Sequence, residues 1–148
     1  MKKKILIGSG VLLVILQVFR TDMTLPASDA NMDFFASETG SAEEVSLIKT
    51  ACYDCHSHQT SYPWYTNIQP IGMWTHGHVK NGREHVNFSE WSALSVEDKK
   101  HALKECAEVL EKKEMPMLPY MMLHNEAWLS EEQRTQLASY FKKRSQSL

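Results

Sequence analysis

The amino-acid sequence predicts an all-α fold, and two observations support this class. Three serines are each followed, three residues later, by an acidic or amide side chain, a pairing that caps the first turn of a helix. These capping boxes are Ser41-Ala-Glu-Glu44, Ser95-Val-Glu-Asp98 and Ser130-Glu-Glu-Gln133. Apolar residues recur at helical spacing after each box, and no run alternates between apolar and polar residues as a half-buried strand does.

The first predicted element is an apolar segment at the N-terminus. Lys2–Lys4 precede an almost unbroken apolar run, Ile5–Phe19, which Arg20 ends. A short basic stretch followed by an apolar run is typical of an export signal. No pattern of small residues typical of cleavage follows closely, so we expect residues 1–20 to remain as a membrane anchor with the lysines in the cytoplasm. The rest of the chain would then lie on the periplasmic side of the bacterial inner membrane.

The charge balance changes after this segment. All 18 acidic residues lie beyond it, together with 12 of the 16 basic residues, so the exported part carries a formal charge of −6. A surface of this sign is not expected to bind nucleic acid. Residues 21–40 are mostly small and polar, and we expect a linker from which Phe34 and Phe35 dock onto the domain surface. Residues 41–148 are expected to form the folded domain.

The first helix of this domain is predicted to begin after Ser41 and to run directly into Cys52-Tyr-Asp-Cys55-His56. At the spacing C-x-x-C-H, two thiols can add to the vinyl groups of one haem and the adjacent imidazole can bind its iron. With 3 Cys and 7 His in 148 residues, chance gives roughly 0.003 matches to this pattern. We therefore predict that Cys52 and Cys55 hold one haem c covalently and that His56 is the proximal ligand.

Three other interpretations of the cysteine pair are weaker. A redox dithiol usually follows a strand, and none is predicted here. A zinc site needs four ligands, and only Cys106 remains, without a second pair. A disulfide across so short a loop gains little from closure. Cys106 falls on the apolar face of its predicted helix, where we expect a small buried hydrophobe.

The segment from Ser57 to Trp91 is rich in aromatic residues and interrupted by prolines and glycines. It is too irregular for long helices and too aromatic for disorder. Because a domain of this size has little other core, we expect the segment to wrap an apolar haem face. Arg83 within it is a candidate partner for a haem propionate, since a guanidinium binds a carboxylate through two parallel hydrogen bonds. The alternative is a solvated Arg83.

The segment between the second and third capped helices offers a second iron ligand. Met115 lies there, and Pro116 and Pro119 stiffen the chain around it. We predict Met115 as this ligand, because a thioether is a common partner of a proximal imidazole. One alternative is that Met115 only fills the core. The other is that a different side chain binds the iron, and the candidates are Met117, Met121, Met122, His76, His78 and His85.

In combination, these motifs resemble a bacterial haem-binding domain family related to cytochrome c. The resemblance rests on Cys52-x-x-Cys55-His56-Ser57, Tyr62-Pro63-Trp64-Tyr65, Gly82-Arg83-Glu84-His85-x-Asn87-Phe88-Ser89-Glu90-Trp91, Met115-Pro116, Tyr120, His124 and Leu129-Ser130-Glu131-Glu132. It covers about residues 34 to 145. It implies a small helical domain like that of cytochrome c, exported and often membrane-anchored, with one covalent haem and His56 as its proximal ligand.

The sequence thus predicts an exported c-type cytochrome that passes single electrons, an electron carrier rather than an enzyme. Its redox protein partners are not named by the sequence, and its contact with the membrane is expected through the N-terminal segment. A thioether ligand in an apolar pocket raises the reduction potential relative to two imidazoles. The alternative function is a haem-based sensor or peroxidase-like protein with an open or labile distal site.

Overall fold

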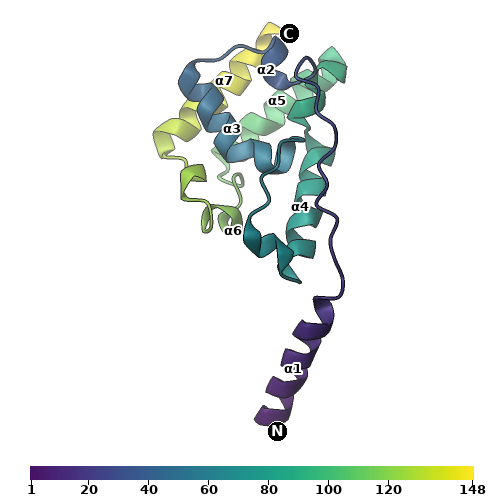
Figure 1. Cartoon of the computed structure of the whole chain (residues 1–148). Helices are drawn as coiled ribbons and strands as arrows, with labels where there is room; N and C mark the ends of the chain where they lie inside the picture. The colour runs from purple at the N-terminus through teal and green to yellow at the C-terminus, as the bar shows by residue number, and fades with distance from the viewer.

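The computed structural model describes all 148 residues, and its regular structure is entirely helical (Figure 1). The predicted all-α class is therefore confirmed. The elements in chain order are α1 (Lys2–Leu16), α2 (Phe34–Ser37), α3 (Ala42–His56), the 3-10 helix η1 (Trp64–Asn67), α4 (Ile71–His85), the 3-10 helix η2 (Phe88–Ala93), α5 (Val96–Glu111), α6 (Leu118–Met121), the 3-10 helix η3 (Asn125–Ala127) and α7 (Glu131–Ser147).

The three serine caps set the starts of α3, α5 and α7 as predicted. Ser41 Oγ accepts a hydrogen bond from the Glu44 amide at 3.2 Å, and the Glu44 carboxylate accepts one from the Ser41 amide at 2.8 Å. Ser130 forms the same reciprocal box at the start of α7. At α5 the Ser95 hydroxyl accepts from the Asp98 amide, but it donates to the Asp98 carboxylate itself. Each cap satisfies backbone donors that the helix cannot pair internally.

One helix departs from the sequence-based expectation. The segment after Ser57 was expected to hold no long helix, yet α4 runs unbroken through Gly72, Gly77 and Gly82. Two of these glycines are contact points. A Cβ atom at Gly72 would lie 2.1 Å from the Thr66 carbonyl oxygen, and one at Gly82 would lie 2.7 Å from the Cys55 carbonyl oxygen. Here glycine allows backbones to approach closely, and the expectation of a broken segment was wrong for its second half.

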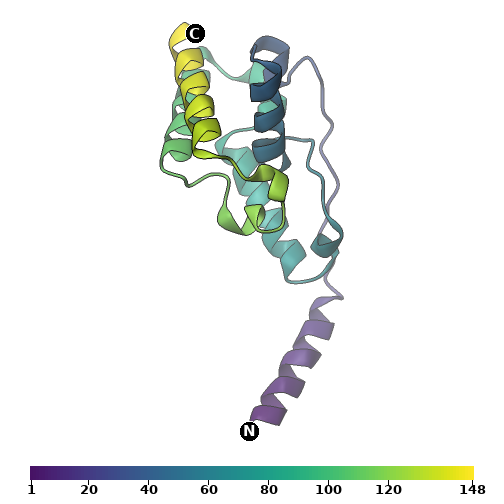
Figure 2. The same cartoon turned by 90° about the vertical axis from the view of Figure 1, so that its left-hand side faces the viewer.

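The domain is built around α3, α5 and α7. α5 and α7 pack side by side, and α3 packs against α7 on one side and α4 on the other (Figures 1 and 2). α2 and η2 close the end of the domain where the C-terminus lies. The core consists of the buried residues Phe34, Ile48, Ala51, Tyr53, Phe88, Trp91, Ala102, Leu103, Ala107, Leu110, Leu129, Leu137, Ala138, Tyr140 and Phe141.

The end of the expected linker lies inside this core. Phe34 is 0% exposed. Its ring meets those of Phe88 and Trp91 edge to face, with ring centroids 5.1 and 4.8 Å away. Such pairs are stabilising beyond the apolar area that they bury. The C-terminal part of residues 21–40 therefore contributes to the fold of the domain.

Two buried carboxylates fasten the same segment. Asp33 accepts hydrogen bonds from the Tyr53 hydroxyl at 3.0 Å and from the side-chain amide of Gln59 at 3.1 Å. Glu38 accepts from the indole of Trp91 at 3.2 Å and from Nε of Arg144 at 2.7 Å. A buried carboxylate without these partners would be costly, so the pattern fixes where the segment enters the domain.

The N-terminal helix projects away from the domain (Figures 1 and 2). Its apolar side chains are exposed on every face. None of the helices in this structure has both the length and the apolar character required to cross a bilayer. The end of α1 is joined to the domain by two reciprocal hydrogen bonds. The side-chain amide of Gln17 donates to the Gln69 carbonyl at 2.9 Å and accepts from the Gln69 amide at 3.0 Å.

The position of Phe34 predicts a large loss of stability on truncation. Replacing Phe34 with Ala leaves a cavity among the aromatic rings and should lower the free energy of unfolding by about 3–5 kcal/mol. Met122 is 68% exposed, and Met122→Ala should change the free energy by no more than about 0.5 kcal/mol. Urea unfolding followed by far-ultraviolet circular dichroism measures both. Equal effects of the two substitutions would contradict the assignment of Phe34 to the core.

Candidate haem site

An apolar cavity of about 380 Å³ lies between α3, α5 and the segment that joins α5 to α6. α3 contributes the cysteine and histidine of the sequence motif, and the joining segment contributes the predicted methionine. The principal lining residues are Ala51, Cys52, His56, His85, Val86, Phe88, Cys106, Val109, Met115, Pro116 and Phe141. The structure thus brings Met115 to the same cavity as Cys52 and His56, which lie about 60 residues earlier in the sequence.

His56 is held in a defined orientation and tautomer. Its Nδ1 lies 2.8 Å from the Gly82 carbonyl oxygen and 3.2 Å from that of Val86. Both partners are acceptors only, so Nδ1 must carry the proton and donate, and Nε2 keeps its lone pair. Burial also lowers the pKa of His56 below its ordinary value, which favours the neutral ring. A neutral imidazole fixed through Nδ1 is the form that binds a metal ion through Nε2.

The carbonyl that fixes His56 depends on a glycine. Gly82 lies on the face of α4 that touches α3, where a Cβ atom would be 2.7 Å from the Cys55 carbonyl oxygen. Contacts this short are not made by real Cβ atoms. Because Gly82 lacks a side chain, α4 approaches α3 closely enough for the His56 ring to reach its carbonyl. Only the glycine carries a sequence signal for this contact, since a carbonyl acceptor is available from any residue.

The two cysteines of the motif face different spaces. Cys52 shares the large cavity with His56, one helical turn away on α3. Cys55 lines a smaller cavity of about 60 Å³ between α3, η1 and α4. Burial raises the pKa of the Cys55 thiol to about 11 and raises that of Cys52 further, so both sulfurs are protonated thiols near neutral pH.

Met115 is positioned by the end of α5. Lys113 takes a left-handed backbone conformation, with φ of 59°, which turns the chain out of the helix. The amides of Glu114 and Met115 then donate to the Val109 carbonyl at 2.9 and 3.3 Å. Nη1 of the buried Arg134 on α7 donates to the Met115 carbonyl at 2.6 Å. The backbone of Met115 is therefore fixed from both sides, and its side chain lies at the cavity.

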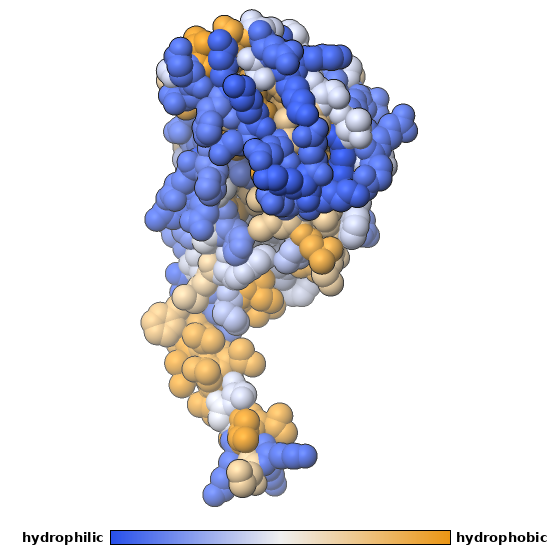
Figure 3. Space-filling model, turned by 180° about the vertical axis from the view of Figure 1, so that it is seen from behind, coloured by the Kyte–Doolittle hydropathy of each residue, from blue (hydrophilic) through white to orange (hydrophobic).

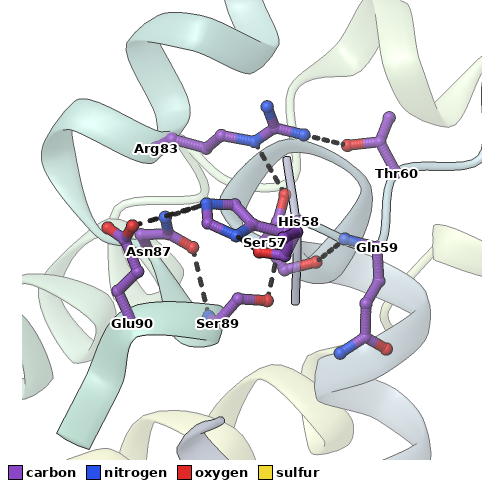
Figure 4. Close-up of polar contacts among 9 residues, drawn as sticks. Ser57, His58, Gln59, Thr60, Arg83, Asn87, Ser89 and Glu90 are labelled. Atoms are coloured by element: carbon purple, nitrogen blue, oxygen red, sulfur yellow. Dashed lines mark hydrogen bonds and ion pairs between the residues drawn. The ribbon is translucent and has the colours of Figure 1, made fainter. Parts of the chain in front are cut away.

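Arg83 lies on α4 but does not line the large cavity. Its Nε donates to the Ser57 carbonyl at 2.7 Å and its Nη2 donates to the Thr60 hydroxyl at 2.9 Å, as Figure 4 shows. In the same view, the Asn87 amide donates to His58 Nε2 at 2.8 Å. Arg83 thus holds the chain that follows His56, and its predicted contact with a haem propionate stays a prediction.

Of the other candidate iron ligands, only one lines the large cavity. His85, an exposed residue, lines the large cavity, whereas His76 and His78 do not. His78 packs on Trp74 with its ring centroid 4.0 Å away. The other methionines also lie outside this cavity, namely Met117, Met121 and Met122. Met115 and His85 are therefore the side chains best placed to complete a coordination sphere with His56.

Cys106, which was expected to be a small buried hydrophobe, is half-buried and lines the same cavity. Burial raises the pKa of its thiol to about 12, so the group behaves as an uncharged, apolar wall. Phe88 and Phe141 were not predicted as lining residues. Their aromatic character was visible, but only the packing of η2 and α7 decides which rings reach the cavity.

The residues present fit a haem. Haem is a flat, largely apolar ring whose iron takes up to two axial ligands, and the cavity offers an apolar lining, a neutral imidazole with a free Nε2 and a thioether. Fold and site together define a helical haem-binding domain. The sequence matches the family model of the haem-binding domain over residues 11–143. The chain therefore belongs to the haem-binding domain family, as its motifs predicted, and it binds haem. No curated protein and no solved structure matches the chain significantly.

The contact at Gly82 predicts a specific effect of one added methyl group. Gly82→Ala should push α4 away from α3, lower the free energy of unfolding by about 1–3 kcal/mol through overpacking, and reduce the fraction of low-spin, imidazole-bound iron in the visible spectrum. No atom lies within 4 Å of a Cβ at Gly77 in the same helix. Gly77→Ala should leave the spectrum unchanged and stabilise the helix by up to about 1 kcal/mol. Identical spectra for both variants would show that the α3–α4 contact does not support the ligand.

Proposed function

We propose that this chain is a c-type cytochrome that carries single electrons on one covalently bound haem. Cys52 and Cys55 attach the ring, His56 is the proximal ligand and Met115 is the distal ligand. The observation that carries the proposal is the His56 ring, whose Nδ1 is committed to the Gly82 carbonyl while the ring lines the same apolar cavity as Met115. Arg83 keeps Nη1 as the nitrogen available to a propionate, because Nε and Nη2 hold the neighbouring chain.

The chain's own residues set the properties of the centre. When bound, haem supplies an iron ion that exchanges one electron. The Gly82 carbonyl, as acceptor from Nδ1, makes His56 a more basic ligand. The apolar lining of the cavity excludes water and disfavours the more highly charged oxidised state. Met115 acts in the same direction, because a thioether ligand raises the reduction potential.

Electron transfer is favoured over catalysis by what surrounds the cavity. Apart from His56 and the cysteines, the ionisable residues that line it are all exposed, namely His85, Glu105, Glu108, Lys112 and Glu114. A peroxidase-like reaction needs an acid–base group held close to the iron, and exposed side chains are poorly suited to that role. The remaining lining is mainly apolar. An environment of this kind supports a centre that changes charge without moving protons.

We also propose that the domain is exported and stays on the periplasmic side of the bacterial inner membrane, with α1 inserted in the bilayer. Lys2–Lys4 precede the apolar residues of α1, which are exposed on every face. A helix with apolar residues all round is unsuited to water. The C-x-x-C-H motif supports the same location, since bacteria attach haem covalently outside the cytoplasm.

Covalent attachment is tested by extraction. Protein made in a host able to attach haem should keep its pigment after acid–organic extraction, because thioether bonds survive it. Cys52→Ala and Cys55→Ala should each lower the pigment retained after denaturing electrophoresis, and the double variant should abolish it. Cys106→Ala is the matched control and should keep it. Extraction of the pigment from the parent protein would refute covalent binding while leaving haem binding intact.

The distal ligand is tested by replacing Met115. Met115→Ala should abolish the sulfur-to-iron charge-transfer band of the oxidised protein and lower the reduction potential. It should also allow rapid carbon monoxide binding to the reduced protein, which the parent should resist. His85→Ala and Met122→Ala should behave as the parent. An unchanged low-spin spectrum for Met115→Ala would reject this ligand, and rapid carbon monoxide binding by the parent would favour the sensor or peroxidase-like alternative.

A further inference from the structure

The domain exposes a group of large apolar side chains on η1 and the start of α4. Trp64 is 76% exposed and Met73 is 52% exposed. We call this group the basal surface, and its members are Trp64, Ile68, Ile71, Met73 and Trp74. Single exposed apolar residues are ordinary, but a contiguous group of them on a small domain indicates an interaction site. Tryptophan in particular is enriched where an apolar phase meets water.

The basal surface belongs to a stretch of chain without formal charges. From Cys55 to Val79 the sequence contains no Asp, Glu, Lys or Arg, although such residues make up 23% of the whole chain. By contrast, α5 and α7 expose many lysines and acidic residues. Moving charged side chains out of water is costly, and the basal surface avoids that cost. An apolar and uncharged surface suits a lipid phase better than it suits a strongly charged partner.

The basal surface lies next to the C-terminal end of α1. The reciprocal hydrogen bonds between Gln17 and Gln69 join the end of α1 to the chain between η1 and α4. A third bond runs from the Gln69 side-chain amide to the Thr21 hydroxyl at 2.9 Å. Figure 3 shows apolar atoms where the domain meets α1, below a largely hydrophilic upper part. A bilayer that holds α1 therefore lies close to these side chains.

The length of α1 strengthens this placement. Its 15 residues extend over about 22 Å at the usual rise of a helix, whereas the hydrocarbon core of a bilayer is about 30 Å thick. A short apolar segment is accommodated when the bilayer thins or when flanking residues move towards the interface. Here the flanking residues at the C-terminal end of α1 are bonded to the domain, so the domain moves with them.

We propose that the basal surface lies in the headgroup region of the membrane that holds α1, with Trp64 and Met73 in contact with lipid. This inference rests on the proposed insertion of α1. Ile71 and Trp74 also line the smaller cavity beside Cys55. Lipid contact at the basal surface therefore covers the rim of that cavity and sets the orientation of the haem domain relative to the membrane.

The test maps lipid contact directly. The full haem-bound chain is reconstituted in vesicles of phosphatidylethanolamine and phosphatidylglycerol that contain a phospholipid with a diazirine in its acyl chain, close to the glycerol. After illumination, mass spectrometry identifies the labelled peptides. Label is expected in α1 and in residues 62–74, and little is expected in α5 or α7, which carry the charged surfaces.

Matched variants identify the side chains responsible. Trp64→Ser combined with Met73→Ser should lower the labelling of residues 62–74 by about tenfold, the factor that corresponds to 1.4 kcal/mol, and leave the labelling of α1 unchanged. Val96→Ser on α5, which removes an apolar side chain that is 45% exposed, should change neither. The visible spectrum checks that each variant is folded and holds haem.

The possible outcomes separate the two proposals. Label in α1 with residues 62–74 no more reactive than α5 overturns the membrane contact and leaves the insertion of α1 standing. Label in residues 62–74 without label in α1 overturns the insertion, and with it the proposal that the basal surface lies in the membrane that holds α1. Absence of label from both segments overturns both.

Discussion

The haem site depends on one hydrogen bond, from Nδ1 of His56 to the Gly82 carbonyl. It sets the tautomer of the ring, frees Nε2 and turns the ring to the cavity that also contains Met115. The acceptor lies in the last turn of α4, where it also accepts a hydrogen bond from the Val86 amide at 3.0 Å and where the helix dipole is negative. That location favours an N–H donor and makes the imidazole more electron-rich. The missing side chain at Gly82 thus supports the orientation of His56.

Core and cavity form one packing unit. Phe88 and Phe141 belong to the aromatic cluster around Phe34 and also line the cavity. The ion pair between Glu38 and Arg144 joins the N-terminal segment of the domain to α7, so the cluster is closed by residues from both ends of the chain. A ligand that fills the cavity contacts the same side chains that stabilise the fold. Haem bound in this cavity would therefore stabilise the folded domain.

Local patterns in the sequence were sufficient for the starts of α3, α5 and α7. Ser41, Ser95 and Ser130 cap helices through neighbours three residues away, and such contacts do not depend on the rest of the fold. Met115 lines the cavity with Cys52 and His56, whereas Cys55 and Arg83 do not line it, and the role of Met115 as an iron ligand stays a prediction. Burial of Phe34 and Glu38 could not be predicted, because their partners lie more than 50 residues further along the chain. The helix α4 was not predicted for the same reason. Its glycines suggested a broken segment, and only the opposing backbone explains Gly72 and Gly82.

The bonds between Gln17 and Gln69 have a consequence for how electrons would reach this protein. They hold the end of α1 directly against the domain, so residues 18–33 do not act as a long, flexible linker between the two. If α1 lies in the lipid and the domain carries electrons, as proposed, the domain would not reach a distant donor, and its encounters would be a lateral search in two dimensions. Tethered reactants meet at a high effective concentration but only in geometries that the tether permits. Under these proposals, exchange partners would present their own redox groups at a fixed height above the bilayer.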